Sequence, residues 1–255
     1  MGTPLFFVLM VAVGLVAQFV DGTLGMGYGV FSTSLLVGIG LAPAIASASV
    51  HTAEIVTTLI SGVSHHYFGN VKKEIFLPLV IPGVTGAVAG AYLLSSIPGA
   101  KIKPYVSLIL VAMGCLILYR FLRRERPEPQ EQLSAWKTSL LGLVAGFLDA
   151  LGGGGWGPVA TPTLILAGNG HPSEVVGSVN LAEFFVTVAA VVTFLFTIGA
   201  ESFNWIVVLA MLIGGAIAAP IGAWVCKKLP HRVLGLAIGV LLIGLNLRTL
   251  MQVWL

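Results

Sequence analysis

The feature that most constrains this chain is a series of long apolar runs that charged residues hardly interrupt. Six runs have about the 20 residues that a helix needs to cross a bilayer: 43–67, 74–96, 103–121, 174–199, 203–226 and 232–253. Over the whole chain 57% of residues are hydrophobic and 9% are charged, whereas a soluble domain carries about 25% charged residues. We therefore expect an all-α polytopic membrane protein.

Two further apolar regions, 4–40 and 138–169, are broken by glycine clusters. The four consecutive glycines at 152–155 predict a helix break, because each glycine in a helix interior costs up to about 1 kcal/mol. Residues 1–7 lack the basic segment of a signal peptide, so we expect the first region to be a structural element. The hydrophilic stretch 122–137 predicts a cytoplasmic linker between two transmembrane units, 1–121 and 138–255.

The two units resemble each other in sequence. Gly14–Gly29 reads GLVAQFVDGTLGMGYG and Gly142–Gly157 reads GLVAGFLDALGGGGWG, with nine of sixteen positions identical. The matched residues include Asp21 with Asp149, Gly25 with Gly153 and Tyr28 with Trp156. After one inserted residue the match continues with Pro43 and Pro172, Ser49 and Ser178, His51 and Asn180, and Glu54 and Glu183. Apolar composition alone would not match acidic residues, so the chain contains an internal repeat.

The distribution of basic residues indicates the topology, because cytoplasmic loops are enriched in Lys and Arg. If each glycine-broken region is a hairpin, three basic residues lie outside (Lys101, Lys103 and Arg248) and ten lie in the cytoplasm. The ten are Lys72, Lys73, Arg120, Arg123, Arg124, Arg126, Lys137, Lys227, Lys228 and Arg232. A single crossing gives at best eight against five, so the hairpin is preferred. A hairpin plus three crossings per unit then predicts two inverted repeats, a common plan of secondary transporters.

The glycine breaks are candidates for a substrate site. A break frees backbone N–H groups, and the arm that follows begins with the positive end of a helix dipole, which suits an anion. The candidate residues are Gly25, Gly27, Gly153, Gly154 and Gly155, with Thr33 and Thr161 on the following arms. The alternative is that the glycines serve only close helix packing, and the threonines equally could bond their own helix backbone.

Matched polar residues inside the spans form a second candidate set. Glu54 and Glu183 lie near the middle of their predicted helices, with His51 and Asn180 one turn before them and Ser49 and Ser178 close by. Three interpretations remain open: substrate binding by Ser49, His51, Ser178 and Asn180; proton relay through Glu54, Glu183 or His51; or a structural polar network. Asp21 and Asp149 precede the breaks and either cap the next helix or take part in transport.

Other chemistries find little support in the sequence. No nucleotide-binding G-x-x-x-x-G-K-[ST] loop is present, and no loop is large enough for an ATP-hydrolysing domain, so we expect no enzyme activity and no cofactor. The net charge of +3 comes from short loops rather than from a nucleic-acid-binding surface. The histidines show no metal-site spacing, and we predict no resident metal. Many small residues on the helix faces would allow a homodimer as well as a monomer.

The repeated segment F-[VL]-D-x-x-x-G-x-G-[YW]-G resembles the motif of the TauE/SafE family of sulfite exporters and toluene-sulfonate permeases, over residues 5–250. Pro158, Thr161 and Pro162 after the second cluster fit the same pattern. The resemblance implies transport of small sulfur-containing anions, such as sulfite or organosulfonates, across the bacterial inner membrane, with export as the expected direction. Two hypotheses compete with it: a cation or metal ion transporter that uses His51, Glu54 and Glu183, and a membrane scaffold without transport.

Overall fold

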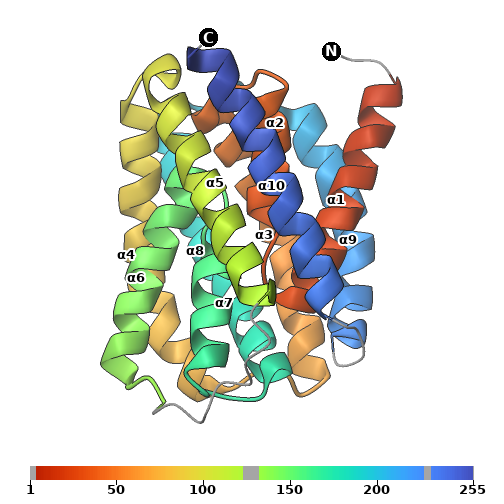
Figure 1. The fold of residues 1–255 in the computed structure, drawn as a ribbon, viewed down its shortest axis with the longest axis vertical. Coiled ribbons are helices and arrows are strands. Elements are labelled where there is room, and N and C mark those ends of the chain that lie inside the picture. Colours follow the sequence, from red (N-terminus) through yellow and green to blue (C-terminus); the bar gives the residue numbers. More distant parts are fainter. Residues whose placement is uncertain (1–3, 123–131, 227–230, 255) are drawn as a thin grey trace.

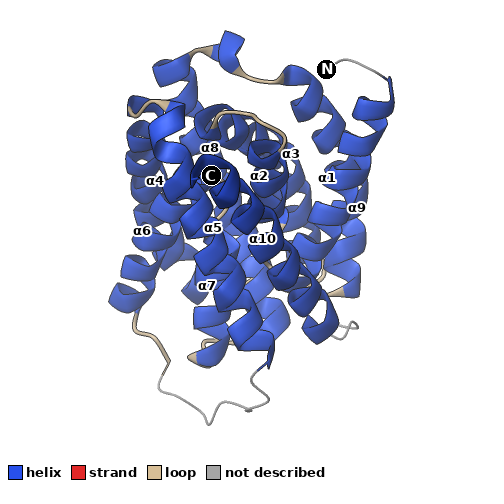
Figure 2. Cartoon of the chain, turned by 45° about the horizontal axis from the view of Figure 1, so that its top comes forward, coloured by secondary structure: helices blue, strands red, loops and turns tan. Residues whose placement is uncertain are grey.

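The computed structural model describes residues 4–122, 132–226 and 231–254, and every regular element in them is a helix (Figures 1 and 2). The helices of the first unit are α1 (Pro4–Leu24), α2 (Tyr28–Gly38), α3 (Pro43–Tyr67), α4 (Lys73–Ser96) and α5 (Gly99–Leu122). Those of the second are α6 (Ala135–Gly152), α7 (Trp156–Leu166), α8 (Pro172–Ile198), α9 (Trp205–Val225) and α10 (His231–Trp254), with a short 3-10 turn, η1 (Ala200–Ser202), before α9. The all-helical prediction is confirmed.

The predicted boundaries agree closely with the helices, with two differences. Helix α5 begins at Gly99 rather than at 103, after Pro98, whose carbonyl accepts from the backbone N–H of Lys101 and Ile102. Helix α6 begins at Ala135, inside the predicted linker 122–137, because the Ser134 carbonyl accepts the first helical bond from the Thr138 N–H at 3.0 Å. Residues 123–131 of that linker lie outside the described residues.

Both glycine-broken regions form helical hairpins with unequal arms. Helix α1 has 21 residues and α2 has 11, while α6 has 18 and α7 has 11. At 1.5 Å per residue, α1 is about 30 Å long and can cross a bilayer alone. Within the described residues, six helices are long and apolar enough to span, namely Pro4–Leu24, Pro43–Tyr67, Lys73–Ser96, Gly99–Tyr119, Pro172–Ile198 and Trp205–Val225.

Each hairpin returns to the end of the molecule from which it starts. Met10 near the start of α1 belongs to the same apolar cluster as Leu36 and Val37 at the end of α2. In the second hairpin, the Asn169 side chain after α7 bonds both the N–H and the carbonyl of Leu133 before α6, each at 3.1 Å. Figure 1 shows the α1–α2 hairpin open toward the end where the N-terminus lies, and the α6–α7 hairpin open toward the opposite end.

The two units interlock rather than forming separate bodies. Helix α1 of the first unit packs along α9 of the second, and α6 of the second packs along α4 of the first. Helix α3 packs against α8 and α9, while α8 packs against α3 and α4. Exchanging every helix for its counterpart in the other unit reproduces these pairings. The cores are therefore shared between the units, and neither unit buries its apolar face alone.

Matched glycines allow close backbone contacts in these helix pairs. A Cβ on Gly14 of α1 would lie 2.6 Å from the Met211 Cα of α9, and a Cβ on Gly142 of α6 would lie 2.8 Å from the Leu79 carbonyl oxygen of α4. Both distances are too short for any side chain, so the helix backbones touch, as is common where small residues line membrane helix interfaces.

Large apolar side chains cover the outside of the bundle. Leu5 is 67% exposed, Ile81 76% and Phe196 87%. These residues lie on α1, α4 and α8, three of the helices long enough to span. Such a surface is stable against acyl chains and unstable in water, so the chain is a multi-pass membrane protein.

Candidate functional site

The helix breaks are built from glycines in conformations that other residues avoid. Between α1 and α2, Gly25 has φ 66° and Gly27 has φ 133°. Between α6 and α7, Gly153 has φ 71° and Gly154 has φ 150°. A side chain in this range of φ strains the backbone. The repeated glycines therefore place a sharp turn inside each hairpin.

The two turns are in direct contact with each other. Thr33 Oγ1 on α2 donates a hydrogen bond to the Gly153 carbonyl at 2.7 Å. The matched residue Thr161 on α7 donates to the Gly25 carbonyl at 2.6 Å. A Cβ on Gly29 would lie 2.6 Å from the Gly154 Cα, so the backbones also meet without side chains between them. Residues that are distant in the sequence thus bring the two breaks together in one contact region. We call this region, which Gly25–Gly29 and Gly153–Gly155 form with Thr33 and Thr161, the crossing.

We expect the two threonine bonds to contribute similarly to stability. Thr33→Val or Thr161→Val keeps the shape but leaves a buried carbonyl unbonded, which costs about 1–2 kcal/mol in either case. Thermal unfolding of the purified protein in detergent measures the loss. Thr85→Val is the control, because Thr85 is exposed on α4 and bonds only the Ile81 carbonyl of its own helix. Unequal effects of the two core substitutions would contradict an equivalent role.

Asp149 lies near the end of α6, and its carboxyl reaches across the break to the start of α7. Its Oδ1 accepts hydrogen bonds from the backbone N–H groups of Gly155 at 2.9 Å and Trp156 at 3.1 Å. In the first unit, the Asp21 carboxyl accepts from the N–H of Tyr28, the residue that matches Trp156. A protein carboxyl therefore already holds N–H groups that the sequence suggested for a substrate anion. A substrate at the crossing must use other groups, or must displace these carboxyls.

His51 connects the second break to α3. Its Nε2 lies 3.0 Å from Asp149 Oδ2 and 4.0 Å from Glu54 Oε2. Its Nδ1 lies 2.8 Å from the Ser47 carbonyl oxygen. Both ring nitrogens therefore have protein partners, which differs from the predicted role of His51 as a substrate ligand. The matched Asn180 instead accepts a hydrogen bond from Ser61 Oγ at 2.7 Å, so the two units differ here.

Carboxyl groups dominate the buried polar centre. Asp21, Glu54, Asp149 and Glu183 are at most 5% exposed, and the other three each interact electrostatically with Asp149. No described lysine or arginine is buried. A bilayer core strongly disfavours unpaired charge, so most of these carboxyls must carry a proton or share one.

The structure places Ser49 and Ser178 away from the crossing, against the connections between helices. Ser49 Oγ accepts a hydrogen bond from the Asn204 N–H just before α9 at 3.0 Å. Ser178 Oγ accepts from the Lys72 N–H just before α4 at 2.8 Å and donates to the Glu174 carbonyl of its own helix at 2.7 Å. The two serines are again equivalent, and their partners are backbone groups. In the structure both hydroxyls connect a helix to the chain just before another helix, and substrate binding by Ser49 and Ser178 stays a prediction.

Gln18 is a buried polar residue that the comparison of the two repeats does not identify as a site candidate. Gln18 is fully buried in α1, and neither its Nε2 nor its Oε1 has a hydrogen-bond partner. Asp21 Oδ2, one turn further along the helix, is also without a partner. The matching position of the second unit is Gly146, so a search for polar residues that recur in both units does not find Gln18. The signal that could have found Gln18 is a polar side chain inside a predicted span that has no polar counterpart in the other unit.

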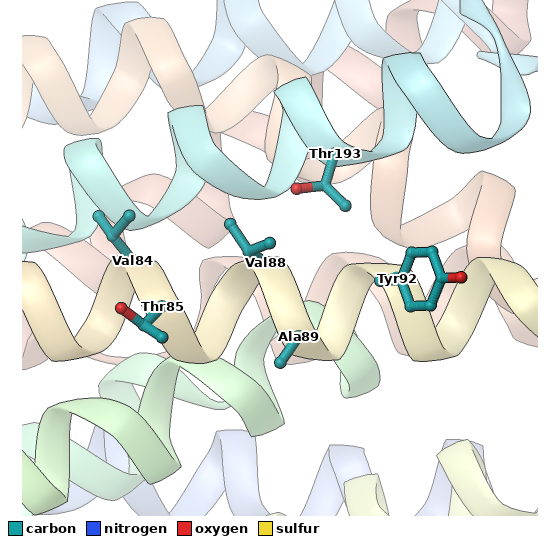
Figure 3. Close-up of a pocket in the computed structure, with 6 residues that line it drawn as sticks. All are labelled: Val84, Thr85, Val88, Ala89, Tyr92 and Thr193. Carbon is teal, nitrogen blue, oxygen red and sulfur yellow. The ribbon is translucent and has the colours of Figure 1, made fainter.

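A groove of about 540 Å³ lies on the outside of the protein and does not fit an anion. Figure 3 shows Val84, Thr85, Val88, Ala89 and Tyr92 along α4, and Thr193 on the neighbouring α8. The hydroxyls of Thr85 and Thr193 already bond carbonyls of their own helices, at 3.0 and 2.8 Å. The lining has no charged side chain, so the crossing of the breaks remains the candidate site. Within the described part of the chain, no group of three or more His, Cys, Asp or Glu side chains could hold a metal ion.

Comparisons with known proteins confirm the family that the repeated motif indicates. The family model of the sulfite exporter TauE/SafE matches residues 10–249. The chain is 48% identical over 246 residues to the probable membrane transporter protein YtnM of Bacillus subtilis (strain 168), covering 95% of this chain and 82% of that protein. No solved structure matches this chain. On this evidence, the chain belongs to the TauE/SafE family of membrane transporters.

Proposed function

We propose that this protein is a secondary transporter of small sulfur-containing anions, such as sulfite or organosulfonates, and that it exports them across the bacterial inner membrane. The observation that carries the proposal is the contact between the two glycine breaks, which brings backbone groups of both units to one place inside the bundle. Irregular backbone inside a membrane protein is stable where it is buried in protein or lines a solute path. The family description points to sulfite as the anion.

In this proposal the two units are inverted repeats that move relative to each other around the crossing. The end that bears Lys72, Lys73 and Lys137 faces the cytoplasm, by the excess of basic residues. The substrate contacts are backbone groups of Gly25, Gly27, Gly153, Gly154 and Gly155 together with the hydroxyls of Thr33 and Thr161. To bind the anion, the two hydroxyls must leave the Gly153 and Gly25 carbonyls, and the Gly155 N–H must leave Asp149. These groups are uncharged, which suits weak binding and rapid release.

A cation transporter is the second candidate, because the buried centre contains four carboxyl groups and no described buried lysine or arginine. Glu54→Gln combined with Glu183→Gln separates the two candidates. The substitution replaces two carboxyls, which can bind a cation, by neutral amides, so anion binding should persist or strengthen, whereas cation binding should be lost.

Ligand-dependent thermal stabilisation of the purified protein tests the proposal. A ligand that binds only the folded protein stabilises it by about 2.7 kcal/mol at 100 times its Kd. We expect sulfite or sulfoacetate to raise the melting temperature more than sulfate, taurine or chloride, and the Glu54→Gln, Glu183→Gln protein to keep this response. Stabilisation by a divalent cation alone, lost in the same double variant, would overturn the anion assignment. Tracer flux of the stabilising anion into proteoliposomes then establishes transport.

A further inference from the structure

The hydrogen bonds of His51 determine where its ring carries a proton. Nδ1 lies 2.8 Å from the Ser47 carbonyl oxygen, which can only accept. The Ser47 hydroxyl, 3.3 Å from Nδ1, uses its own hydrogen in a 2.9 Å bond to the Ala150 carbonyl, so it too can accept from the ring. Both neighbours therefore require the hydrogen to be on Nδ1. A neutral imidazole with its hydrogen there has only a lone pair at Nε2.

The lone pair of such a ring would face the carboxyl of Asp149. Nε2 and Oδ2 are 3.0 Å apart, a hydrogen-bonding distance that needs one proton between them. The proton can belong to an imidazolium beside a carboxylate or to a carboxylic acid beside a neutral ring, and in both cases the pair has no net charge. Removing the proton leaves a negative carboxylate against a lone pair, where His51 is fully buried and Asp149 is 2% exposed.

Several titratable groups surround this pair from the helices packed around it. They are Asp21 on α1, Tyr28 on α2, Glu54 on α3 and Glu183 on α8. Glu54 is the closest, with its Oε2 4.0 Å from Nε2. None of the described lysines or arginines is buried among these groups. The neighbours are acidic or neutral, and the pair has the shortest contact between an acid and a base among them, so its proton is a positive charge that can balance an arriving anion.

We propose that the His51–Asp149 pair is a proton-binding site that couples proton movement to transport, with proton and anion bound together and moving in the same direction. Net export then occurs where the outward anion gradient exceeds the inward proton gradient, and the reverse gradients drive uptake. The inference rests on the proposed anion transport and deepens it. Asp149 also bonds the N–H groups of Gly155 and Trp156, so the protonation of the pair acts directly on the second break. Coupling between two bound species is reciprocal: the proton strengthens anion binding, and the anion strengthens proton binding. Asn180, the residue that matches His51, does not titrate near neutral pH, so only the unit with His51 contributes such a histidine.

Proteoliposomes that contain a pH dye test the proposal, with labelled sulfoacetate as the probe because it is fully ionised near neutral pH. Tracer exchange at equal sulfoacetate and equal pH on both sides reports transport without net proton movement. An acidic outer buffer should drive sulfoacetate accumulation in the native protein, together with sulfoacetate-dependent acidification of the lumen. Asp149→Asn keeps an acceptor for the N–H groups of Gly155 and Trp156 and a donor toward His51, but its side chain has no proton that titrates near neutral pH. The tracer exchange that it retains should no longer respond to the pH gradient, so accumulation and acidification, each divided by the exchange rate, should fall at least tenfold.

His51→Gln is the second variant, because its amide reaches about the position of the imidazole ring and has no proton that titrates near neutral pH. His66→Asn is the control, since His66 is exposed on the same helix, and it should retain both accumulation and acidification. Native protein that exchanges tracer without moving protons would overturn the coupling and leave transport intact. Proton movement that persists in both Asp149→Asn and His51→Gln would overturn the assignment to this pair. Native protein that neither exchanges sulfoacetate nor is stabilised by any of the anions would instead contradict the proposed function.

Discussion

Replacing Asp149 with alanine is expected to destabilise the protein by about 3–5 kcal/mol, the usual cost of removing one partner from a buried charged pair. The substitution leaves the N–H groups of Gly155 and Trp156 without their acceptor and His51 without its partner. All of these groups are buried, and lipid offers them no replacement. The melting temperature and the monodispersity of the detergent-purified protein measure the effect.

A matched comparison separates burial from charge. Lys72 and Glu174 form an ion pair of 2.8 Å whose side chains are 41% and 28% exposed, and Lys72→Gln should cost at most about 1 kcal/mol. Asp149→Asn preserves the hydrogen bonds and should fall between the two. If Asp149→Ala melted at the same temperature as Lys72→Gln, Asp149 would not hold the second break in place.

Gly154→Ala is expected to destabilise the protein by about 2–6 kcal/mol, the second large effect. Two costs combine at this position. The backbone has φ 150°, where a side chain adds about 1–3 kcal/mol of strain. A Cβ would also lie 2.7 Å from the Gly29 Cα, and overpacking of this kind costs about 1–3 kcal/mol. Because the contacting group is backbone of the other break, no side chain can move aside to relieve the overlap.

Gly244→Ala in α10 provides the control for Gly154→Ala. A Cβ at Gly244 would meet nothing within 4 Å, and alanine favours a helix over glycine by up to about 1 kcal/mol. This protein should therefore melt at the same temperature as the native one or slightly higher. The contact between the breaks would be refuted if Gly154→Ala behaved like Gly244→Ala.

The local pattern of the sequence predicts most of the helices and their ends. Helix α3 spans Pro43–Tyr67 as its apolar run indicates, and the other spans differ by a few residues. The repeated glycines predict both breaks, because backbone propensity acts within a few residues and does not depend on distant contacts. The repeat also indicates which residues are equivalent, such as Thr33 with Thr161 and Ser49 with Ser178.

The match between two residues of the repeat does not predict which residues each of them contacts in the folded protein. Thr33 bonds Gly153, 120 positions away, and His51 bonds Asp149, 98 positions away, and neither contact joins matched residues. The predicted roles of Ser49 and Ser178 in substrate binding differ from their observed contacts for the same reason, since the helix registers place them against chain connections. Gln18 has no counterpart at all.

The sequence by itself determined that this chain is a helical membrane protein of two repeated units with a broken hairpin in each. The apolar runs, the internal repeat, the glycine clusters and the distribution of basic residues are sufficient for that conclusion. Only the tertiary structure decided that the two breaks cross, that Asp149 lies between His51 and the start of α7, and that the units share their cores. Those features depend on how helices from different units pack against each other, which is a property of matching surfaces and not of any one segment.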